Sequence, residues 1–341
     1  MIKPKNTLKR DPNQLTLIFR EIISRLSSEF PPHLDVPNLF ISTFGSPIYH
    51  QKEKSGNISA AYLLITQIIL YQILSGKRKD LPKIKINSLS SNLLTSYFEK
   101  ALKITHSPLF KPIITKGLDR GTFTLLEDSI KEIINLRLEL LQYEVLAQIF
   151  NSLIPFSLRK RIGAYYSGIK TAKLLSHLAI RDPSVKIFDP ACGSGALLIA
   201  SYQRKKELTE LTGNKFTITD HKRFLSSEIT GIDIMPFAIH LSAIHLALQA
   251  PFWDIRQNRL AVHDSIFLNP KSRLQEFLSQ KKNISTVDLV IMNPPFVRQE
   301  SMKKIRPSYK NELHQIFEEY SLFINKKMSY YCYFLFLADK F

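Results

Sequence analysis

The sequence predicts an α/β fold, in which a mostly parallel sheet follows an all-helical domain. Two observations predict it. Up to about residue 150 the apolar residues recur at helical spacing, whereas four short apolar runs appear after that point with helical patterns between most of them. Strands that alternate with helices form parallel sheets. We therefore expect an N-terminal helical domain over residues 1–150 and an α/β domain over residues 151–341.

The composition favours a polyanionic partner. The 341 residues include 47 Lys and Arg against 29 Asp and Glu, which gives a net charge of +18. Nucleic acid is the leading candidate for such a partner. The basic residues are scattered along the chain, so a generally basic protein surface remains the alternative.

The cysteine content and the apolar runs indicate a cytoplasmic protein that does not enter a membrane. Cys192 and Cys332 lie far apart, and no Cys/His spacing typical of a metal site occurs. The longest apolar run, residues 60–74, is interrupted by polar residues and is too short to span a bilayer. The start of the chain lacks the apolar region of a signal peptide.

The first part of the chain carries four helical patterns. We expect helices over residues 11–30, 57–75 and 128–150, the first ended by the Pro-Pro pair at 31 and 32. Another helical segment is expected between about 88 and 115, broken by Pro108 and Pro112. None of these segments carries a catalytic motif. A further amphipathic helix begins near Ile169 and leads into the first apolar run.

That first run, residues 185–189, ends in the turn Asp189-Pro190-Ala191-Cys192-Gly193-Ser194-Gly195, and an Ala/Leu-rich helix follows. Glycine lets a backbone approach a ligand closely, and the start of a helix presents N–H groups. The pattern therefore predicts a strand, a ligand-binding turn and a helix.

Three more strands are predicted, and each ends near a polar residue. Residues 227–234 end at Asp233, residues 259–268 contain Asp264, and residues 286–293 end at Asn293. The carboxyl ends of parallel strands carry the ligand site of an α/β sheet. His240 and His245, between the second and third strands, are five residues apart and off one helical face, so we interpret them as packing residues.

The ligand that fits these strand ends is an adenosyl-sulfonium donor. A nicotinamide dinucleotide is disfavoured because the turn lacks a third glycine and because Asp233 lies much further than about 20 positions from the turn. We expect Asp233 to accept hydrogen bonds from the ribose hydroxyls and Asp264 to accept one from the adenine amino group. Tyr165 and Ser194 are secondary candidates.

The tetrapeptide Asn293-Pro294-Pro295-Phe296 indicates the reaction. The side-chain oxygen of Asn293 and the carbonyl of Pro294 offer two acceptors to an exocyclic amino group, which localises its lone pair for attack on a methyl group. The prolines fix the backbone before the substrate arrives, and Phe296 offers a face for a flipped base. A simple strand-ending turn is the alternative for this tetrapeptide alone.

These motifs together resemble the adenine-specific DNA methyltransferases of restriction-modification systems, particularly type I modification subunits and type IIG-like enzymes. The matching segments are GAYYS (163–167), DPACGSG (189–195), GIDI (231–234), HDS (263–265) and NPPF (293–296). The resemblance implies a Rossmann-like sheet, S-adenosylmethionine as methyl donor, and DNA with a flipped adenine as acceptor. It implies that the donor is bound by Tyr165, Tyr166, Ser167, Asp189, Ala191, Gly193, Ser194, Gly195, Asp233, Ile234, Asp264 and Ser265.

Two departures from the family pattern bear on activity. Ser167-Gly168 stands where the family has Thr-Pro after its paired tyrosines. The chain ends with a helix over residues 329–341, before the further strands and the target-recognition domain that family members add. We therefore expect an incomplete sheet and a second polypeptide that supplies the remainder.

Two other functions stay open from the sequence. One is a methyltransferase of the same fold that acts on an RNA base or on a release-factor glutamine, since such enzymes share NPP-type loops. The other is an inactive remnant, or a subunit that binds the donor or DNA without turnover unless a second chain is present.

Overall fold

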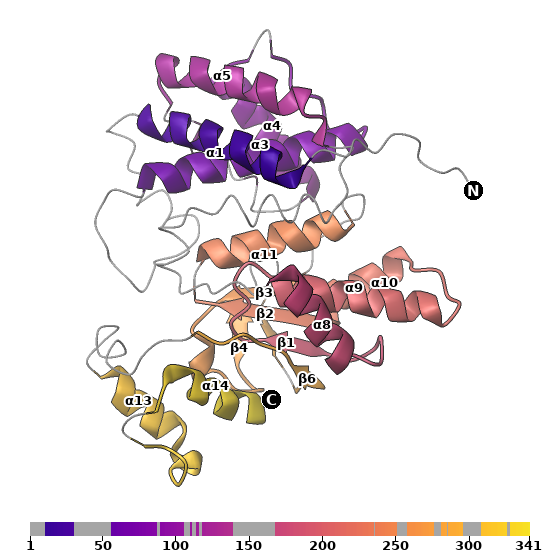
Figure 1. Ribbon diagram of the computed structural model, residues 1–341, viewed down its shortest axis with the longest axis vertical. Helices are drawn as coiled ribbons and strands as arrows, with labels where there is room; N and C mark the ends of the chain where they lie inside the picture. Colours follow the sequence, from indigo (N-terminus) through magenta and orange to yellow (C-terminus); the bar gives the residue numbers. More distant parts are fainter. Residues whose placement is uncertain are drawn as a thin grey trace. The chain divides into compact units, whose positions relative to one another are not determined.

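The computed structural model describes residues 11–30, 56–86, 89–105, 110, 114–115, 118–138, 168–234, 236–250, 258–275, 281–284, 286–295, 308–325 and 328–341. The chain divides into two compact units, one built from the N-terminal helices and one built around a sheet (Figure 1). The boundary predicted at residue 150 lies outside the described residues, so it stays a prediction.

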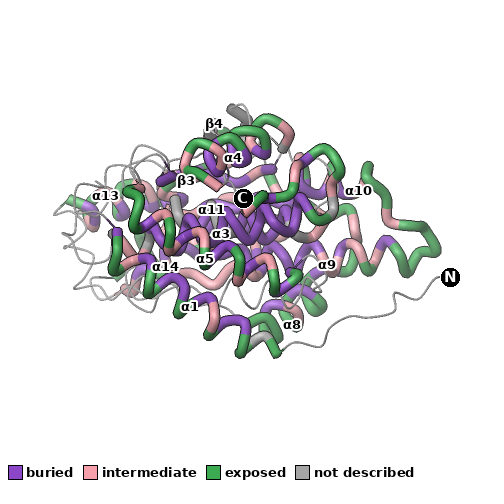
Figure 2. The backbone as a smooth tube through the Cα atoms, turned by 90° about the horizontal axis from the view of Figure 1, so that it is seen from above, coloured by how far each residue is buried: buried purple, intermediate pink, exposed green. Residues whose placement is uncertain are grey.

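The first unit consists of helices, as the sequence predicts. They are α1 (Pro12–Ser28), α3 (Gly56–Lys77), α4 (Ser91–Thr105) and α5 (Arg120–Asn135). Helix α3 is buried from Ala60 to Ser75 (Figure 2), and it contacts each of the other three. Most of its residues are apolar on every face, as expected of a helix that packs against three others. None of the described helices combines the length and the apolar character that crossing a membrane requires.

The position of α5 differs from the prediction. The helix begins eight residues before the predicted start at 128, because the Asp119 side chain caps it by accepting the Thr122 N–H at 2.8 Å. It ends at Asn135, followed by Arg137 with a left-handed φ of 48°. A continuous helix over residues 128–150 is therefore wrong, since a left-handed residue interrupts the helical backbone. Residues 139–150 lie outside the described part of the chain.

The second unit confirms the predicted α/β fold. Its sheet is fully parallel, with the strand order β3-β2-β1-β6, and helices lie between β1 and β2 and between β2 and β3 in the chain. The strands are β1 (Ile187–Asp189), β2 (Ile229–Asp233), β3 (Arg259–Val262) and β6 (Leu289–Val290). The helices are α8 (Ile169–Ala179), α9 (Ala196–Leu211), α10 (Ile218–Arg223), α11 (Pro236–Gln249), α13 (Tyr309–Ile316) and α14 (Tyr330–Asp339).

Two features of this unit are not predicted from the sequence. A small antiparallel pair, β4 (Arg273–Gln275) and β5 (Lys281–Asn283), lies between β3 and β6 in the chain. Helix α13 precedes the predicted terminal helix, which is α14. Side chains of α13 and α14 pack together in one apolar cluster that also contains Ile266.

Alternating residues of β1 face the two sides of the sheet. Ile187 packs with Leu197 of α9 and Ala172 of α8 on one side. The next residue, Phe188, packs with Ile232 of β2 and Ala261 of β3 on the other side. This alternation is the period of a strand buried on both faces, and it explains the continuous apolar runs in the sequence.

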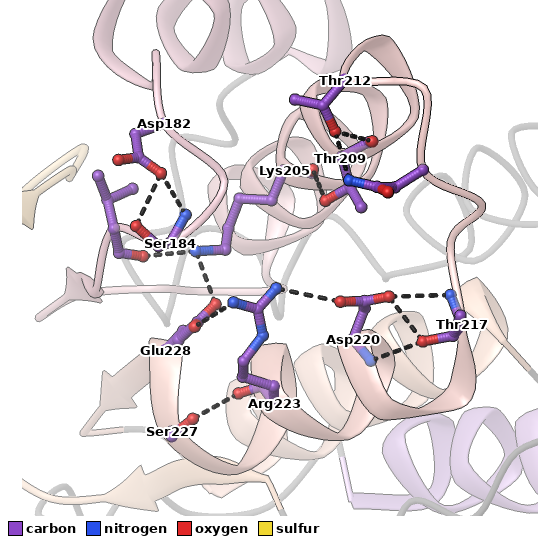
Figure 3. A network of polar contacts seen from close by, with 12 residues as sticks. Asp182, Ser184, Lys205, Thr209, Thr212, Thr217, Asp220, Arg223, Ser227 and Glu228 are labelled. Atoms are coloured by element: carbon purple, nitrogen blue, oxygen red, sulfur yellow. Dashed lines mark hydrogen bonds and ion pairs between the residues drawn. The ribbon is translucent and has the colours of Figure 1, made fainter.

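The strands are braced at their amino ends by a buried ion pair (Figure 3). The ammonium group of Lys205 on α9 lies 2.9 Å from Oε2 of Glu228, which directly precedes β2, and it also donates to the carbonyl of Val185, just before β1. Neither charged side chain is more than 8% exposed. Arg223 extends the network, with Nη1 3.4 Å from Oε1 of Glu228. The pair thereby ties α9 to two strands on the side opposite their carboxyl ends.

Candidate active site

The four parallel strands bring four polar residues to one edge of the sheet. β1 and β2 end at Asp189 and Asp233, Asp264 follows β3, and Asn293 follows β6. With the strand order β3-β2-β1-β6, they succeed one another along that edge as Asp264, Asp233, Asp189 and Asn293. Parallel strands place their carboxyl ends on the same edge, which is where α/β sheets bind ligands.

The turn between β1 and α9 depends on two glycines with left-handed φ values, 53° at Gly193 and 83° at Gly195. A Cβ on Gly195 would lie 2.8 Å from Oγ and 3.1 Å from Cα of Ser242, so a larger residue would collide with α11. A Cβ on Gly193 would have nothing within 4 Å. The turn is therefore packed tightly against α11 at Gly195 and borders open space at Gly193.

Asp233 fastens the end of β2 to this turn. Its Oδ2 accepts the backbone N–H of Gly193 at 2.9 Å. Beside this bond, the N–H of Cys192 donates to the carbonyl of Ile232, also at 2.9 Å. Ile234, the next predicted donor-binding residue, is half-buried. The second strand end is thus fixed relative to the glycine turn by a charge-assisted bond and a backbone bond.

Asp189 supports the turn from within the protein. It is 1% exposed, and its Oδ1 accepts the N–H of Ala191 at 3.1 Å. Burial raises the pKa of Asp189 to about 8. The hydrogen bond from Ala191 acts in the opposite direction, and the nearby negative charge of Asp233 raises the pKa further. The carboxyl group is therefore mostly protonated at neutral pH.

The site lacks the features of thiol or metal chemistry within the residues described. Cys192 is buried, and burial, together with Asp233 and Asp189, raises the pKa of its thiol well above the ordinary value. A thiol is a nucleophile only as the thiolate, so the burial and the raised pKa of Cys192 both disfavour a nucleophilic role. Among the described side chains, no group of three His, Cys, Asp or Glu residues is arranged to hold a metal ion.

Asp264 is held by bonds to both carboxylate oxygens. Oδ1 accepts the N–H of Ile266 at 3.3 Å, which caps a short 3-10 helix, and Oδ2 accepts the hydroxyl proton of Tyr309 at 2.9 Å. The next residue, Ser265, is buried and donates to the carbonyl of Pro190 in the glycine turn. The segment after β3 is therefore tied both to α13 and to the turn after β1.

Asn293, Pro294 and Pro295 follow β6 without regular secondary structure, and all three are half-buried. Just before them, the N–H of Ile291 donates to the carbonyl of Phe188 at 3.0 Å, which fixes where the segment leaves the sheet. Four other predicted site residues lie outside the described part of the chain: Phe296, Tyr165, Tyr166 and Ser167.

The structure adds two residues of α11 to the site. Ser242 donates to the carbonyl of Gly193 at 2.8 Å, and Nδ1 of His245 lies 2.7 Å from the carbonyl of Ser194. His245 is buried, as expected for a packing residue, and it also holds the turn. The available signal was a serine and a histidine three residues apart in a mostly apolar helix.

Comparison with known proteins identifies the family. A family model described as N-6 DNA methylase matches residues 142–339, more than half of the chain. The curated type I restriction enzyme MjaVIII methylase subunit of Methanocaldococcus jannaschii is 25% identical over 152 residues, which are 44% of this chain and 23% of that subunit. The chain thus spans about a quarter of the length of this relative.

A solved structure shows the same fold. The type IIG restriction endonuclease BpuSI matches with a TM-score of 0.56 and 16% identity, over 97% of this chain and 32% of that chain. This likeness shows a shared fold. Membership of a family is shown by the family model that matches residues 142–339. The resemblance inferred from the motifs is confirmed: the chain belongs to the N-6 DNA methylase family.

Proposed function

We propose that this chain transfers a methyl group from S-adenosylmethionine to the exocyclic amino group of adenine in DNA. One observation carries the proposal. The glycine turn, Asp233, Asp264 and the Asn293-Pro294 segment all follow parallel strands at one edge of a single sheet. A donor site and an acceptor site at neighbouring strand ends are what a direct transfer between two substrates requires.

The residues of the turn fit the donor. The open space at Gly193 lets a ligand approach the backbone, since a Cβ there would meet no atom within 4 Å. Asp233 and Asp264 supply acceptors for ribose hydroxyls and for the adenine amino group, and a carboxylate accepts up to about four hydrogen bonds. When bound, S-adenosylmethionine supplies an electrophilic methyl group on a sulfonium.

In this proposal, Asn293 and Pro294 bind the adenine that accepts the methyl group. An adenine amino group is a poor nucleophile because its lone pair is delocalised into the ring. The Asn293 side-chain oxygen and the Pro294 carbonyl would each accept a hydrogen bond from one N–H of that amino group, which localises the lone pair on the nitrogen. Two consecutive prolines, Pro294 and Pro295, restrict the backbone, so the acceptors are oriented in advance.

The proposal includes two macromolecular partners. DNA fits the net charge of +18, and a base in a duplex must be flipped out to reach the sheet edge. A second polypeptide fits the edge strand β6, which pairs with β1 and, within the described residues, with no strand on its other side (Figure 1). Exposed edges of this kind are normally covered.

The first test is methyl transfer. The protein is incubated with S-adenosylmethionine labelled in the methyl group and with DNA, RNA or a release factor. We expect label in DNA adenine, and a loss of at least about a hundredfold in Asn293→Ala, because an oriented acceptor is removed. The exposed Asn214→Ala serves as the matched control and should retain the wild-type rate.

Each other outcome selects a different function. Label in RNA or in the release factor would replace the proposed acceptor. Donor binding without transfer to any of the three would indicate a binding subunit, and restoration of transfer by a co-expressed second chain would then identify the partner. Label in DNA from Asn293→Ala at the wild-type rate would overturn the proposed mechanism.

A further inference from the structure

One face of α11 makes hydrogen bonds to the glycine turn at Gly193 and Ser194. Ser242 and His245 are three residues apart, so they lie on the same side of the helix. Each is fully buried, and most of the residues around them in the helix are apolar. A buried polar side chain needs a hydrogen-bond partner, and the glycine turn supplies one to each of these two residues.

Both contacts are made to carbonyl groups of the turn. Ser242 Oγ lies 2.8 Å from the carbonyl of Gly193, and His245 Nδ1 lies 2.7 Å from the carbonyl of Ser194. A carbonyl only accepts, so Nδ1 of His245 carries the proton. By contrast, Ser129 on α5 bonds to the carbonyl of Leu125 in its own helix. Ser242 instead bonds to a residue 49 positions away in the sequence.

The close approach at Gly195 belongs to the same arrangement. A Cβ on Gly195 would lie 2.8 Å from Oγ of Ser242, so the turn rests directly on the residue that holds it. Burial lowers the pKa of His245 to about 4, which keeps its imidazole neutral at physiological pH. The support of the turn therefore carries no charge of its own.

These bonds determine the polarity that the turn presents to a ligand. Two consecutive carbonyl oxygens, which would repel a ligand carboxylate, are directed at donors on α11. The first N–H groups of a helix attract anions, so the start of α9 is the part of the turn that suits a ligand carboxylate. The amino-acid part of S-adenosylmethionine carries a carboxylate, whereas its adenosine part does not.

We propose that Ser242 and His245 are positioning residues that select the amino-acid part of the donor by holding the Gly193 and Ser194 carbonyls against α11. This inference rests on the proposed use of S-adenosylmethionine. It assigns to α11 a role in donor affinity that is separate from the contacts of Asp233 and Asp264 with the adenosine part.

Two ligands separate this role from general support of the fold. S-adenosylhomocysteine contains the amino-acid part, and 5′-methylthioadenosine lacks it. We expect His245→Leu to weaken S-adenosylhomocysteine binding at least tenfold in calorimetry and to change 5′-methylthioadenosine binding less than threefold. The near-isosteric His245→Asn keeps an N–H at the position of Nδ1, so it should restore affinity to within threefold of wild type.

Ser242→Ala provides an independent variant that removes only one hydroxyl group, and it decides the question if His245→Leu does not fold. It should weaken S-adenosylhomocysteine three- to tenfold and leave 5′-methylthioadenosine unchanged. Equal weakening of both ligands, or no weakening of either, would overturn the positioning role. Failure of the wild-type protein to bind S-adenosylhomocysteine or S-adenosylmethionine would instead reject the proposed function.

Discussion

The hydroxyl group of Tyr309 donates a hydrogen bond of 2.9 Å to Oδ2 of Asp264. The same oxygen of Tyr309 lies 2.6 Å from the hydroxyl of Tyr330, and both tyrosines are buried. Because the proton of Tyr309 is directed at the carboxylate, Tyr330 donates to Tyr309. Helices α13 and α14 therefore orient an acidic residue that follows β3, through a chain of two hydroxyl groups.

Tyr309→Phe should weaken every ligand that contains the adenine base. The change removes one hydrogen bond to a charged acceptor, worth about 1.5–3 kcal/mol, and lets the Asp264 carboxylate turn. We expect S-adenosylhomocysteine and 5′-methylthioadenosine to lose affinity in parallel, by about tenfold or more, in calorimetric titrations. Loss for only one of the two ligands would contradict adenine recognition by Asp264.

Tyr330→Phe is the matched control for this chain of hydroxyls. It removes a bond between two neutral groups and leaves the Tyr309 bond to Asp264 in place, so its effect should be within about threefold. An effect as large as that of Tyr309→Phe would mean that packing of the α13 and α14 cluster, and not the hydrogen bond, supports the site.

Gly195→Ala adds only one methyl group, but we expect it to disrupt the turn. The residue has a φ of 83°, and the added Cβ would lie 3.1 Å from the backbone Cα of Ser242, which cannot move aside as a side-chain end can. We expect donor affinity to fall at least about tenfold, because the turn must shift away from α11. Equilibrium binding of S-adenosylmethionine is the measurement.

Gly213→Ala separates backbone strain from the close contact. Gly213 has nearly the same φ, 81°, but a Cβ there would have nothing within 4 Å, and it follows the far end of α9. This variant should lose about 1–2 kcal/mol of stability and keep wild-type donor affinity. Equal loss of affinity in both variants would show that the effect at Gly195 is not local.

Much of the fold and the site could be predicted because the signals are local. Each strand of the parallel sheet is a short apolar run that ends near a polar residue, and Asp189, Asp233, Asp264 and Asn293 appear in the sequence as such ends. Helices between parallel strands then place these ends on one edge. The convergence of the four residues thus followed from topology alone.

The contacts that hold the site are long-range, and no local pattern encodes them. Ser242 and His245 find their partners in backbone carbonyls of the turn, which any sequence would supply. Lys205 lies among several charged residues of α9, yet it is buried and pairs with Glu228, which comes from another element. Tyr309 similarly contacts Asp264, which lies 45 positions earlier in the sequence.

The stability of the protein should depend on pH through Asp189. Its pKa is about 8 in the folded protein, against about 3.9 in an unfolded chain. Between these values the folded state holds one more proton than the unfolded state, so the free energy of unfolding falls as pH rises, by up to about 1.4 kcal/mol per pH unit. Asp189→Asn should remove this slope, so its stability relative to wild type should improve from pH 5 to pH 8.

Urea denaturation at pH 5, 6, 7 and 8 measures this difference. Asp182→Asn is the control, because this exposed carboxyl accepts bonds from Ser184 that lower its pKa, and it does not titrate in that range. The stability of the control relative to wild type should be constant. A constant difference between Asp189→Asn and wild type across the same range would show that Asp189 is already ionised at pH 5.

Lys205→Met should destabilise the sheet domain by about 3–5 kcal/mol, since it leaves Glu228 buried without its closest cation. The remaining pairing of Glu228 with Arg223 at 3.4 Å places the expected loss at the lower end of that range. The double variant Lys205→Met/Glu228→Leu removes both charges, so it should recover most of the loss. Denaturant unfolding of the single and double variants tests this as a double-mutant cycle.

The exposed Lys222→Met is the control for charge alone and should match wild type. Donor affinity should stay unchanged in every folded variant, because the pair lies at the amino ends of the strands and the site at their carboxyl ends. A double variant that is as unstable as the sum of its parts would show that the two side chains act separately and do not form one brace.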